Sequence, residues 1–338
     1  MQKNKDKRPT IRDVAREAGV SYGTVSRVLN NQPDVAADTR VLVQRVMEKM
    51  GYQRNLGAQM LTTHQSNIIE IIVMDVHFGI SLPEMGKFIS GAGYSTLYSE
   101  CTRENFAATL DKAASRLVDG IILYAPKLQI ADEELLAMSH GIPIVRRDYV
   151  LESKLTWVGY SQEHATRIAM QHLIDHGHEQ IAEITGSLDF INPRLRHHTW
   201  HSMLLSNGLE LGPSYTGDYS TFARAMKTGY EGVKEFLKQG VAFTAIMTVN
   251  DYAALGAISA LHEHNLRVPE DVSIISFDDN AISSYLIPPL TTIRFDFTIQ
   301  NKLASQFLLE QITDPEYIHH QHVLIPDLII RKSVQPPR

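Results

Sequence analysis

The sequence predicts an α/β protein in which a three-helix head precedes a larger core of two lobes with parallel sheets. Three observations lead to this expectation. Residues 10–30 have the spacing of two short helices joined by a turn. From residue 67 onward, short apolar runs rich in β-branched residues alternate with helical stretches. The core holds about 270 residues, which is large for one open sheet and natural for two α/β lobes.

The head begins with the run TIRDVAREAGVSYGTVSRVLN at residues 10–30. Thr10 and Ser21 stand where each can cap the first turn of a helix. Gly19 stands where the chain must turn between the two helices. Apolar residues recur at helical spacing, so the helices can share a small core; they are Val14, Ala18, Val25, Val28 and Leu29. This layout is typical of a helix-turn-helix, which places its second helix in the DNA major groove.

The outer face of the second helix carries the side chains expected to read DNA. Tyr22, Gly23, Ser26 and Arg27 lie near its start, where base edges are contacted. The Arg27 guanidinium can fork onto guanine O6 and N7, which is worth about 1–3 kcal/mol of discrimination. Other polar side chains suit phosphate contacts that fix register: Thr10, Ser21, Thr24 and Asn30. Helix capping alone also explains the two residues that begin the helices, and the tyrosine can be a solvated surface ring.

A third helix is expected at residues 38–50, ended by Gly51. Val41, Val46 and Met50 stand at near-helical spacing there and are expected to pack on the first two helices. The run RNLGAQML at residues 54–61 is too short for a stable helix by itself. We therefore interpret the segment after the third helix as a linker.

The charge distribution separates the head from the core. The chain carries 32 Lys and Arg against 38 Asp and Glu. Residues 1–60 hold 11 basic and 6 acidic residues, and the remainder holds 21 and 32. A basic head on an acidic body is expected when only the head meets DNA phosphate, although chance clustering gives the same count.

The core strands are expected at apolar runs at 68–74, 120–125, 142–145, 181–185, 243–249 and 272–277. Helical stretches separate most of these runs, at 104–117, 162–176, 228–239 and 251–264. Strands that are buried on both faces and joined by helices form parallel sheets.

Several function classes are disfavoured. Cys101 is the single cysteine, so the chain cannot form an internal disulfide, which favours a reducing, cytoplasmic compartment. The basic start MQKNKDKRP is not followed by an apolar run and no run of about 18 apolar residues occurs, so no secretory signal, membrane span or membrane partner is expected. Phosphate-binding glycine motifs are absent and Asp278–Asp279 are adjacent, which argues against a nucleotide-binding enzyme or a glycosidase. The histidines of the run HLIDHGH suit a helix end and turn, so no metal and no cofactor are expected.

Four runs carry a resemblance to a known family: DVAREAGVSYGTVSRVLN in the head, HLIDHGHEQIA at 172–182, TVNDYAALGAISALHEHNLRVPEDVSIISFDD at 248–279, and IPPLTTIR at 287–294. On these runs the chain resembles the LacI/GalR family of bacterial transcription regulators, and the last run looks most like the lactose-repressor branch. The resemblance implies a helix-turn-helix head, a hinge helix and a periplasmic-binding-protein-like core.

The resemblance also implies how the chain is divided. The chain of such a core crosses between its lobes three times, and we expect the crossings near residues 160, 292 and 324. The expected divisions are a head at 1–53, a hinge helix and linker at 54–66, and a core at 67–338, with lobe 1 at about 67–160 and 293–324 and lobe 2 at about 161–292 and 325–338.

The segment that resembles the hinge helix ends at Leu61. In the family, one such leucine from each subunit inserts into the minor groove at the operator centre, which bends the duplex. Asn55 and Ala58 lie on the same hinge. The resemblance therefore implies a homodimer on double-stranded DNA with a palindromic operator. No heptad tail follows Arg331, so we expect dimers rather than tetramers. Gly23 departs from the lactose-repressor pattern, which has a glutamine there, and this predicts a different operator.

Arg196, Asn250 and Asp278 match the residues with which the family contacts sugars. The last two follow expected strands, and ligands of open parallel sheets bind at that edge. A carboxylate accepts from two vicinal hydroxyls, a guanidinium donates in a fork, and an amide does one of each. Aromatic side chains complete the expected effector site: Tyr149, Tyr219 and Phe297. Other roles stay open. Asp278 can stabilise a turn, and Arg196 can form an ion pair between the lobes. Asn250 can cap a helix, and Tyr219 can belong to the core.

Two departures from the family pattern affect the pocket wall. The loop after the first core strand, near residues 75–79, is about three residues shorter than usual, and Tyr-Ser-Gln stands at 160–162 where the family has Asp-Asn. The leading interpretation is a dimeric repressor of carbohydrate-use genes that a sugar or glycoside releases, with a galactoside as the first candidate. The alternatives are a non-enzymatic sugar-binding protein and a regulator that uses a corepressor such as a purine.

Overall fold

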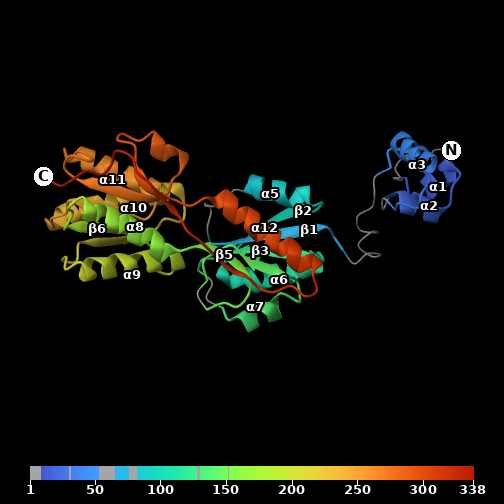
Figure 1. Ribbon diagram of the computed structural model, residues 1–338, viewed down its shortest axis with the longest axis horizontal. Coiled ribbons are helices and arrows are strands. Elements are labelled where there is room, and N and C mark those ends of the chain that lie inside the picture. The colour runs from blue at the N-terminus through green and yellow to red at the C-terminus, as the bar shows by residue number, and fades with distance from the viewer. Residues whose placement is uncertain (1–8, 30–31, 53–64, 76–81, 128–129, 151) are drawn as a thin grey trace. The chain divides into compact units, whose positions relative to one another are not determined.

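The computed structural model describes residues 9–29, 32–52, 65–75, 82–127, 130–150 and 152–338 (Figure 1). The chain divides into two compact units, residues 1–66 and 67–338. The predicted DNA-contacting residues Asn30, Asn55, Ala58 and Leu61 lie outside the described residues. No helix among those that are described is long and apolar enough to cross a membrane.

The first unit contains the expected helix-turn-helix, formed by α1 (Ile11–Ala18) and α2 (Tyr22–Leu29). The Asp13 amide donates to Thr10 Oγ1 at 3.3 Å, and the Asp13 carboxylate accepts from the Thr10 amide at 3.0 Å, which completes a capping box. Gly19 ends α1 in the left-handed region, with φ of 63°. Ser21 Oγ accepts from the Thr24 amide at 3.0 Å. The predicted caps and turn are confirmed.

The third helix, α3 (Ala37–Met50), closes the head core against α1 and α2. One prediction about it was wrong. Val41 is 52% exposed, whereas Val43 is fully buried and Val46 is 8% exposed. Successive residues of an α-helix are separated by about 100°, so Val41 lies roughly opposite Val43. The sequence run contains three valines, and only their contacts with the other two helices decide which of them face inward.

The second unit contains two six-stranded sheets, which define two lobes. In lobe 1 the strand order is β11-β5-β4-β3-β1-β2, and every pair is parallel. These strands are β1 (Ile68–Met74), β2 (Ser95–Cys101), β3 (Gly120–Tyr124), β4 (Ile144–Arg146), β5 (Trp157–Tyr160) and β11 (Gln321–Leu324).

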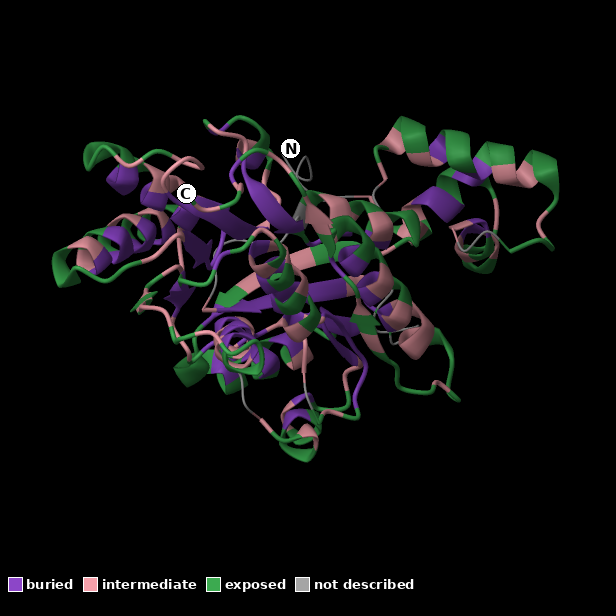
Figure 2. Ribbon diagram, turned by 60° about the vertical axis from the view of Figure 1, so that its left-hand side comes forward, coloured by how far each residue is buried: buried purple, intermediate pink, exposed green. Residues whose placement is uncertain are grey.

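Lobe 2 has the order β12-β10-β9-β8-β6-β7, in which only the β10–β12 pair is antiparallel. Its strands are β6 (Ile181–Gly186), β7 (Ser214–Gly217), β8 (Ala245–Thr248), β9 (Ser273–Asp278), β10 (Thr291–Arg294) and β12 (Asp327–Ile329). The central strands of both sheets are buried along almost their whole length (Figure 2). The six strands expected from apolar runs coincide with β1, β3, β4, β6, β8 and β9.

Helices cover both faces of each sheet. Lobe 1 carries α5 (Leu82–Gly91), α6 (Phe106–Ser115), α7 (Asp132–Met138) and α12 (Phe297–Thr313), with the short 3-10 helix η1 (Arg103–Asn105). Lobe 2 carries α8 (Gln162–Asp175), α9 (Ile191–Ser206), α10 (Phe222–Gln239) and α11 (Asp251–Glu263), with the 3-10 helix η2 (Ala281–Ser284). Each lobe has two apolar clusters, as expected for a sheet between two helical layers.

The chain passes between the lobes three times. It leaves lobe 1 after β5 to enter α8, returns between β10 and α12, and leaves again between β11 and β12. Each passage starts from the carboxyl end of a strand, at Tyr160, Arg294 and Leu324. The carboxyl edges of both sheets therefore border the region between the lobes, where open parallel sheets bind ligands.

Candidate functional site

The exposed face of α2 carries the described part of the predicted DNA-reading set. Tyr22 is 55% exposed, Gly23 and Arg27 are exposed, and Thr24 and Ser26 are half-buried. Among the phosphate candidates, the Thr10 and Ser21 hydroxyls accept the capping hydrogen bonds of their helices. The side chains that remain available to base edges are those on the outer face of α2.

Arg27 is held only loosely on this face. Its Nη1 atom lies 3.7 Å from Asp34 Oδ2, and both side chains are more than half exposed. Exposed ion pairs of this kind are worth about 0–1 kcal/mol, so the guanidinium can leave the pair for a guanine. A Cβ at Gly23 would meet only Ser21 Oγ, at 3.6 Å. The backbone therefore does not require glycine there.

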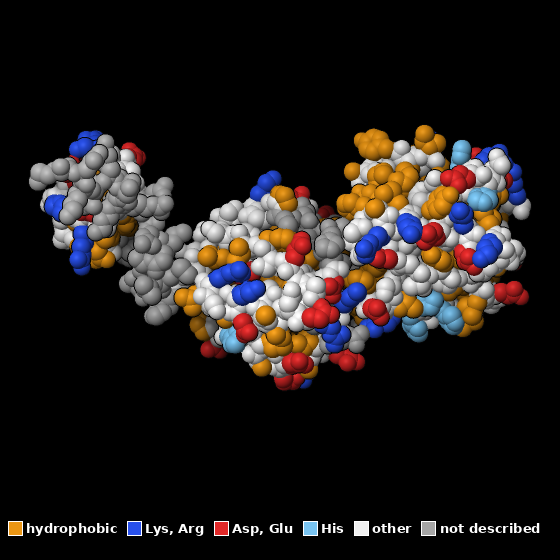
Figure 3. Space-filling view, turned by 180° about the vertical axis from the view of Figure 1, so that it is seen from behind, with side chains coloured by type: hydrophobic (Ala, Val, Ile, Leu, Met, Phe, Trp, Pro, Cys, Tyr) orange, Lys and Arg blue, Asp and Glu red, His pale blue; other side chains and the backbone are white. Residues whose placement is uncertain are grey.

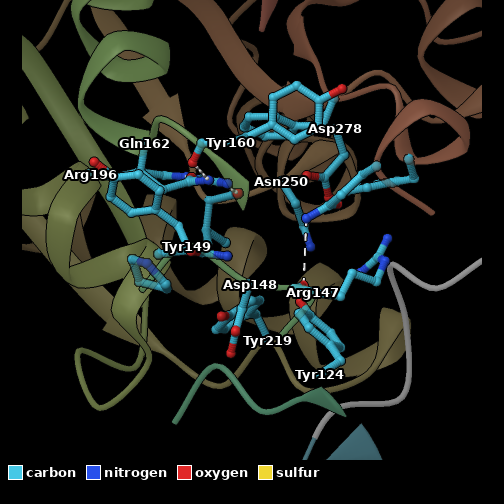
Figure 4. Close-up of a pocket in the computed structure, with 16 residues that line it drawn as sticks. Tyr124, Arg147, Asp148, Tyr149, Tyr160, Gln162, Arg196, Tyr219, Asn250 and Asp278 are labelled. Atoms are coloured by element: carbon cyan, nitrogen blue, oxygen red, sulfur yellow. Dashed lines mark hydrogen bonds between the residues drawn. The ribbon is translucent and has the colours of Figure 1, made fainter. Parts of the chain in front are cut away.

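In the second unit, one cavity of about 70 Å³ brings together all six residues predicted to bind effector (Figure 4). Four belong to lobe 2: Arg196 on α9, Tyr219 after β7, Asn250 before α11 and Asp278 at the end of β9. Tyr149 after β4 and Phe297 at the start of α12 belong to lobe 1. The cavity therefore lies between the lobes, at the carboxyl edges of both sheets.

Arg196 is 7% exposed and is held in place by lobe 2. Its Nε donates to Gln162 Oε1 at 2.8 Å and its Nη1 to the Val249 carbonyl at 2.7 Å (Figure 4). The guanidinium lies over the Phe277 ring, 4.1 Å from its centroid. Burial lowers the pKa of Arg196, and the negative charge of Asp278 opposes this shift. These partners fix the guanidinium within one lobe, so the alternative of an inter-lobe ion pair is not what the structure shows.

Asn250 and Asp278 present polar groups at the same edge. Asn250 Oδ1 caps α11 by accepting from the Ala253 amide at 2.9 Å, so the alternative of a helix cap holds, and the residue also lines the cavity. Asp278 has a φ of 102°, in a region that favours glycine. Burial raises the pKa of its carboxyl group to about 7, with Arg196 opposing and Asp251 adding to the shift.

Aromatic rings form the remaining walls. Tyr219 packs edge-on against Phe190, with 5.1 Å between ring centroids, and Tyr149 packs in the same way on Trp157 at 5.4 Å. Gly186 leaves the space that the Tyr219 ring occupies, because a Cβ there would lie 2.3 Å from Cδ1 of the tyrosine. The ring is thus placed by the residue that ends β6.

Ten further residues line the cavity, and eight of them carried no prediction: Tyr124, Arg147, Asp148, Asn192, Pro193, Val249, Phe295 and Gln300. Tyr160 and Gln162 belong to the run that departs from the family pattern, so that signal did point to the wall. Arg147 and Asp148 directly follow β4, and their position after a buried strand is the same signal that identified Asp278.

A second cavity of about 530 Å³ adjoins the first and shares Asp148 and Tyr149 with it. Ile191 and Arg194 of α9 line it from lobe 2, and residues after β3 and β4 line it from lobe 1. The shortened loop near residues 75–79 falls mostly outside the described residues. Within the described part of the chain, no three His, Cys, Asp or Glu side chains gather as metal ligands do.

Two family models match the chain. The model for bacterial regulatory proteins of the lacI family matches residues 10–55, and the model for a periplasmic binding protein-like domain matches residues 170–334. The lactose operon repressor of Escherichia coli (strain K12) is 32% identical over 97% of this chain and 91% of its own length. The HTH-type transcriptional repressor PurR of Pasteurella multocida (strain Pm70) is 32% identical over 96% of this chain and 98% of its own length.

Solved structures agree with these matches. A lac repressor dimer bound to operator and the anti-inducer ONPF superposes with a TM-score of 0.88 at 31% identity, covering 97% of this chain and all of that one. The transcriptional regulator CelR in complex with cellobiose gives a TM-score of 0.68 at 26% identity, again over 97% of this chain and all of the other. Similarity that extends over nearly the full length of the chain establishes that this protein belongs to the lacI family of bacterial regulatory proteins.

Proposed function

We propose that this regulator is a repressor of carbohydrate-use genes that binds a palindromic operator as a homodimer and releases it when a sugar fills the interlobe cavity. One observation carries the proposal. Six side chains from six separate parts of the chain converge on one cavity, and the same chain bears a helix-turn-helix head. Membership of the family leads us to expect a ligand between the lobes, and the side chains that line the cavity can form hydrogen bonds with sugar hydroxyls.

The DNA contacts in this proposal divide into two kinds. Tyr22, Ser26 and Arg27 read base edges, and Gly23 changes which operator is preferred because it lacks a side chain. Phosphate contacts from Thr10, Ser21, Thr24 and Asn30 fix the register. The hinge residues Asn55, Ala58 and Leu61 follow by resemblance alone. A selection from random palindromes that recovers the lactose-type operator would contradict the role given to Gly23.

The homodimer is supported by the lac repressor structure, which is a dimer bound to operator. Lobe 2 of this chain also exposes apolar surface. Hydrophobic side chains gather on one side of it (Figure 3), and Ile287 and Tyr285, which belong to this lobe, are 90% and 83% exposed. Homodimer interfaces are more apolar than other protein surface, so we place part of the dimer contact here.

The polar groups of the cavity suit a sugar. Arg196 offers a guanidinium, Asn250 a side-chain NH₂, and Asp278 a carboxylate that accepts from vicinal hydroxyls. The cavity of about 70 Å³ adjoins the second cavity of about 530 Å³, with which it shares Asp148 and Tyr149. A ligand that binds one arrangement of the lobes more tightly than the other shifts the population of lobe positions.

Two measurements on the purified full-length chain test the proposal. A thermal-shift panel of monosaccharides, disaccharides and purines identifies the ligand, because a ligand at 100 times its dissociation constant adds about 2.7 kcal/mol. Fluorescence anisotropy then follows binding to a duplex recovered by selection. We expect a sugar to raise the melting temperature and to release the duplex. A shift with a purine alone, or a purine that tightens DNA binding, contradicts the sugar-induced mechanism.

The proposal also includes that the protein works in the cytoplasm, beside DNA, and that it does not turn its ligand over. Incubation with chromogenic glycosides tests the second point. Binding without release of chromophore supports a regulator, whereas steady turnover that is lost in Asp278→Asn shows an enzyme.

A further inference from the structure

A second cavity adjoins the one that holds the predicted sugar contacts, and the proposed function gives it no role. It measures about 530 Å³, against about 70 Å³ for the effector cavity. Asp148 and Tyr149 line both, so the two spaces meet at the segment that follows β4. Most of the space in these two cavities therefore lies outside the group of residues predicted to hold the sugar.

Hydrogen bonds between distant segments hold the walls of the second cavity together. Asp132, at the start of α7, accepts from Ser153 Oγ at 2.8 Å and from the Lys154 amide at 2.6 Å. These two bonds join α7 to the segment that precedes β5. The Ile191 amide, at the start of α9, donates to the Pro126 carbonyl at 3.1 Å, which joins the two lobes beside the same cavity. Segments of both lobes that are hydrogen-bonded to one another thus bound this space.

The Tyr149 ring lies where the two cavities meet. Its backbone packs against Gly159, where an added Cβ would come within 2.5 Å of Tyr149 Cα. Its ring packs edge-on against Trp157, with 5.4 Å between the centroids. These two contacts fix the ring in the wall that the cavities share. A fixed aromatic ring offers an apolar surface to the C–H groups of a sugar ring on either side of the junction.

The second cavity combines an apolar interior with a charged margin. Its buried and half-buried apolar residues are Ala125, Pro126, Ile130, Val150 and Ile191. The charged residues that line it and are exposed include both signs: Glu133, Glu152, Lys154 and Arg194. Carboxylates accept hydrogen bonds and cations donate them, and a hydroxyl group can do both. This lining therefore suits a ring that has an apolar face and hydroxyl groups around its edge.

We propose that the effector is a disaccharide whose second sugar ring occupies this second cavity. The inference rests on the proposed function, because Arg196, Asn250 and Asp278 hold the first ring in the effector cavity. The second ring then packs beside Tyr149 and reaches the charged margin with its hydroxyl groups. Because α9 of lobe 2 lines the second cavity together with segments of lobe 1, the second ring contacts both lobes. Its binding free energy therefore depends on how the lobes are arranged.

The competing explanation is that the second cavity is only a solvent-filled entrance to the first. An entrance does not distinguish a disaccharide from a methyl glycoside with the same first ring, because neither gains contacts there. The proposal, in contrast, requires that the disaccharide binds more tightly and that the gain depends on the space beside α7. Two or three hydrogen bonds and one aromatic contact typically correspond to an affinity change of about 10- to 100-fold.

The experiment compares matched ligands on the full-length chain, by thermal shift and then by calorimetric titration. Each pair shares its first ring and its anomeric configuration: methyl β-glucoside with cellobiose, methyl α-glucoside with maltose, and methyl β-galactoside with lactose. We expect the disaccharide of at least one pair to bind about 10- to 100-fold more tightly than its methyl glycoside. The matching phenyl glycoside is expected to bind less tightly than this disaccharide, because a phenyl group forms no hydrogen bonds at the charged margin.

Three variants assign the preference to the second cavity. Ala131 is exposed and lines the second cavity but not the first. Ala131→Trp is expected to lower the affinity for the disaccharide to that for the methyl glycoside, and to leave the methyl glycoside unaffected. Val150→Phe narrows the same cavity from the segment after β4 and is expected to act in the same way. Ala137→Trp is the matched control, since Ala137 is exposed on α7 and lines neither cavity, and it is expected to keep the ratio.

Three results overturn the inference: no disaccharide that binds wild-type protein more tightly than its methyl glycoside, a phenyl glycoside that binds as tightly as the disaccharide, or a folded cavity variant that keeps the wild-type ratio. The melting temperature without ligand shows whether each variant folds. If neither cavity variant folds, the wild-type pairs and the phenyl glycosides still decide. A methyl glycoside that releases the operator as well as any disaccharide leaves the proposed function intact and removes only this inference. Failure of every sugar to bind, or failure to bind any selected palindrome, removes the proposed function instead.

Discussion

Replacing Gly186 with alanine tests how the effector cavity is built. Gly186 ends β6, and a Cβ at this position would lie 2.3 Å from Cδ1 and 2.4 Å from Cε1 of Tyr219. Carbon atoms in contact are about 3.5–4.0 Å apart, so the ring must move by roughly 1 Å or more. The ring packs edge-on against Phe190, with an interplanar angle of 69°. The ring therefore cannot move without changing both this contact and the cavity wall.

The magnitude follows from the two contacts involved. Overpacking costs about 1–3 kcal/mol, and an edge-on aromatic pair contributes about 0.5–1.5 kcal/mol. Both describe the same displacement of Tyr219, so they are not added. We expect the free energy of unfolding of Gly186→Ala to fall by about 1–3 kcal/mol. Loss of one aromatic wall contact lowers effector affinity by about tenfold.

Urea unfolding measures the first effect, and the effector concentration that releases half of a labelled operator measures the second. Gly91→Ala is the control, because Gly91 ends α5 and a Cβ there meets nothing within 4 Å. Operator affinity without effector is expected to be unchanged in both variants. A Gly186→Ala protein with wild-type stability and wild-type effector response would refute the reasoning from this contact.

Four further outcomes are expected. Val25→Ala removes a fully buried side chain from the head and is expected to lower the stability of the head by about 2 kcal/mol, which faster amide exchange in the head would show. The control Val41→Ala changes an exposed side chain and is expected to leave amide exchange unchanged. Equal effects of the two substitutions would contradict the head core described here. Arg27→Ala reduces discrimination between the selected operator and random duplex by about 1–3 kcal/mol, and equal losses on both duplexes argue against base reading. Burial raises the pKa of Asp278 from 3.8 to about 7, so the folded chain binds more protons than the unfolded chain between these values, and the free energy of unfolding falls as pH rises through this window. Asp278→Asn removes this part of the pH dependence in urea titrations, and an unaltered profile contradicts the assignment. Ile287→Asp weakens the dimer in light scattering, and an unchanged dimer places the contact elsewhere.

The features that could be predicted from the sequence are those set by local chemistry. Thr10, Gly19 and Ser21 act through backbone groups a few residues away, so their roles follow from spacing alone. Asn250 follows the buried strand β8 and Asp278 ends the buried strand β9, and the parallel topology brings such positions to one edge. The central strands could also be predicted, because strands that are buried on both faces have continuous apolar runs in the sequence.

The features that escaped prediction depend on contacts between distant segments. The edge strands β2 and β7 are half exposed, so they lack apolar runs and gave no signal. Arg147 belongs to a charged run that is typical of surface, and it is buried by contacts with distant segments, which include the Tyr124 ring and Phe297 and Asn301 of α12. The inward face of α3 was likewise decided by tertiary contacts, because three valines offered alternative stripes.

The central claim is that occupation of the interlobe cavity governs how tightly the head holds DNA. The most direct measurement is the affinity of the full-length dimer for its selected palindromic duplex, by fluorescence anisotropy, with and without the sugar that most raises its melting temperature. We expect the protein to bind this duplex more tightly than random competitor, and to bind it more weakly once the sugar is added. The Asn250→Ala protein is expected to keep its affinity for the duplex in both conditions. The claim would be contradicted if the protein showed no preference for any palindrome, or if the stabilising sugar left its affinity for the duplex unchanged.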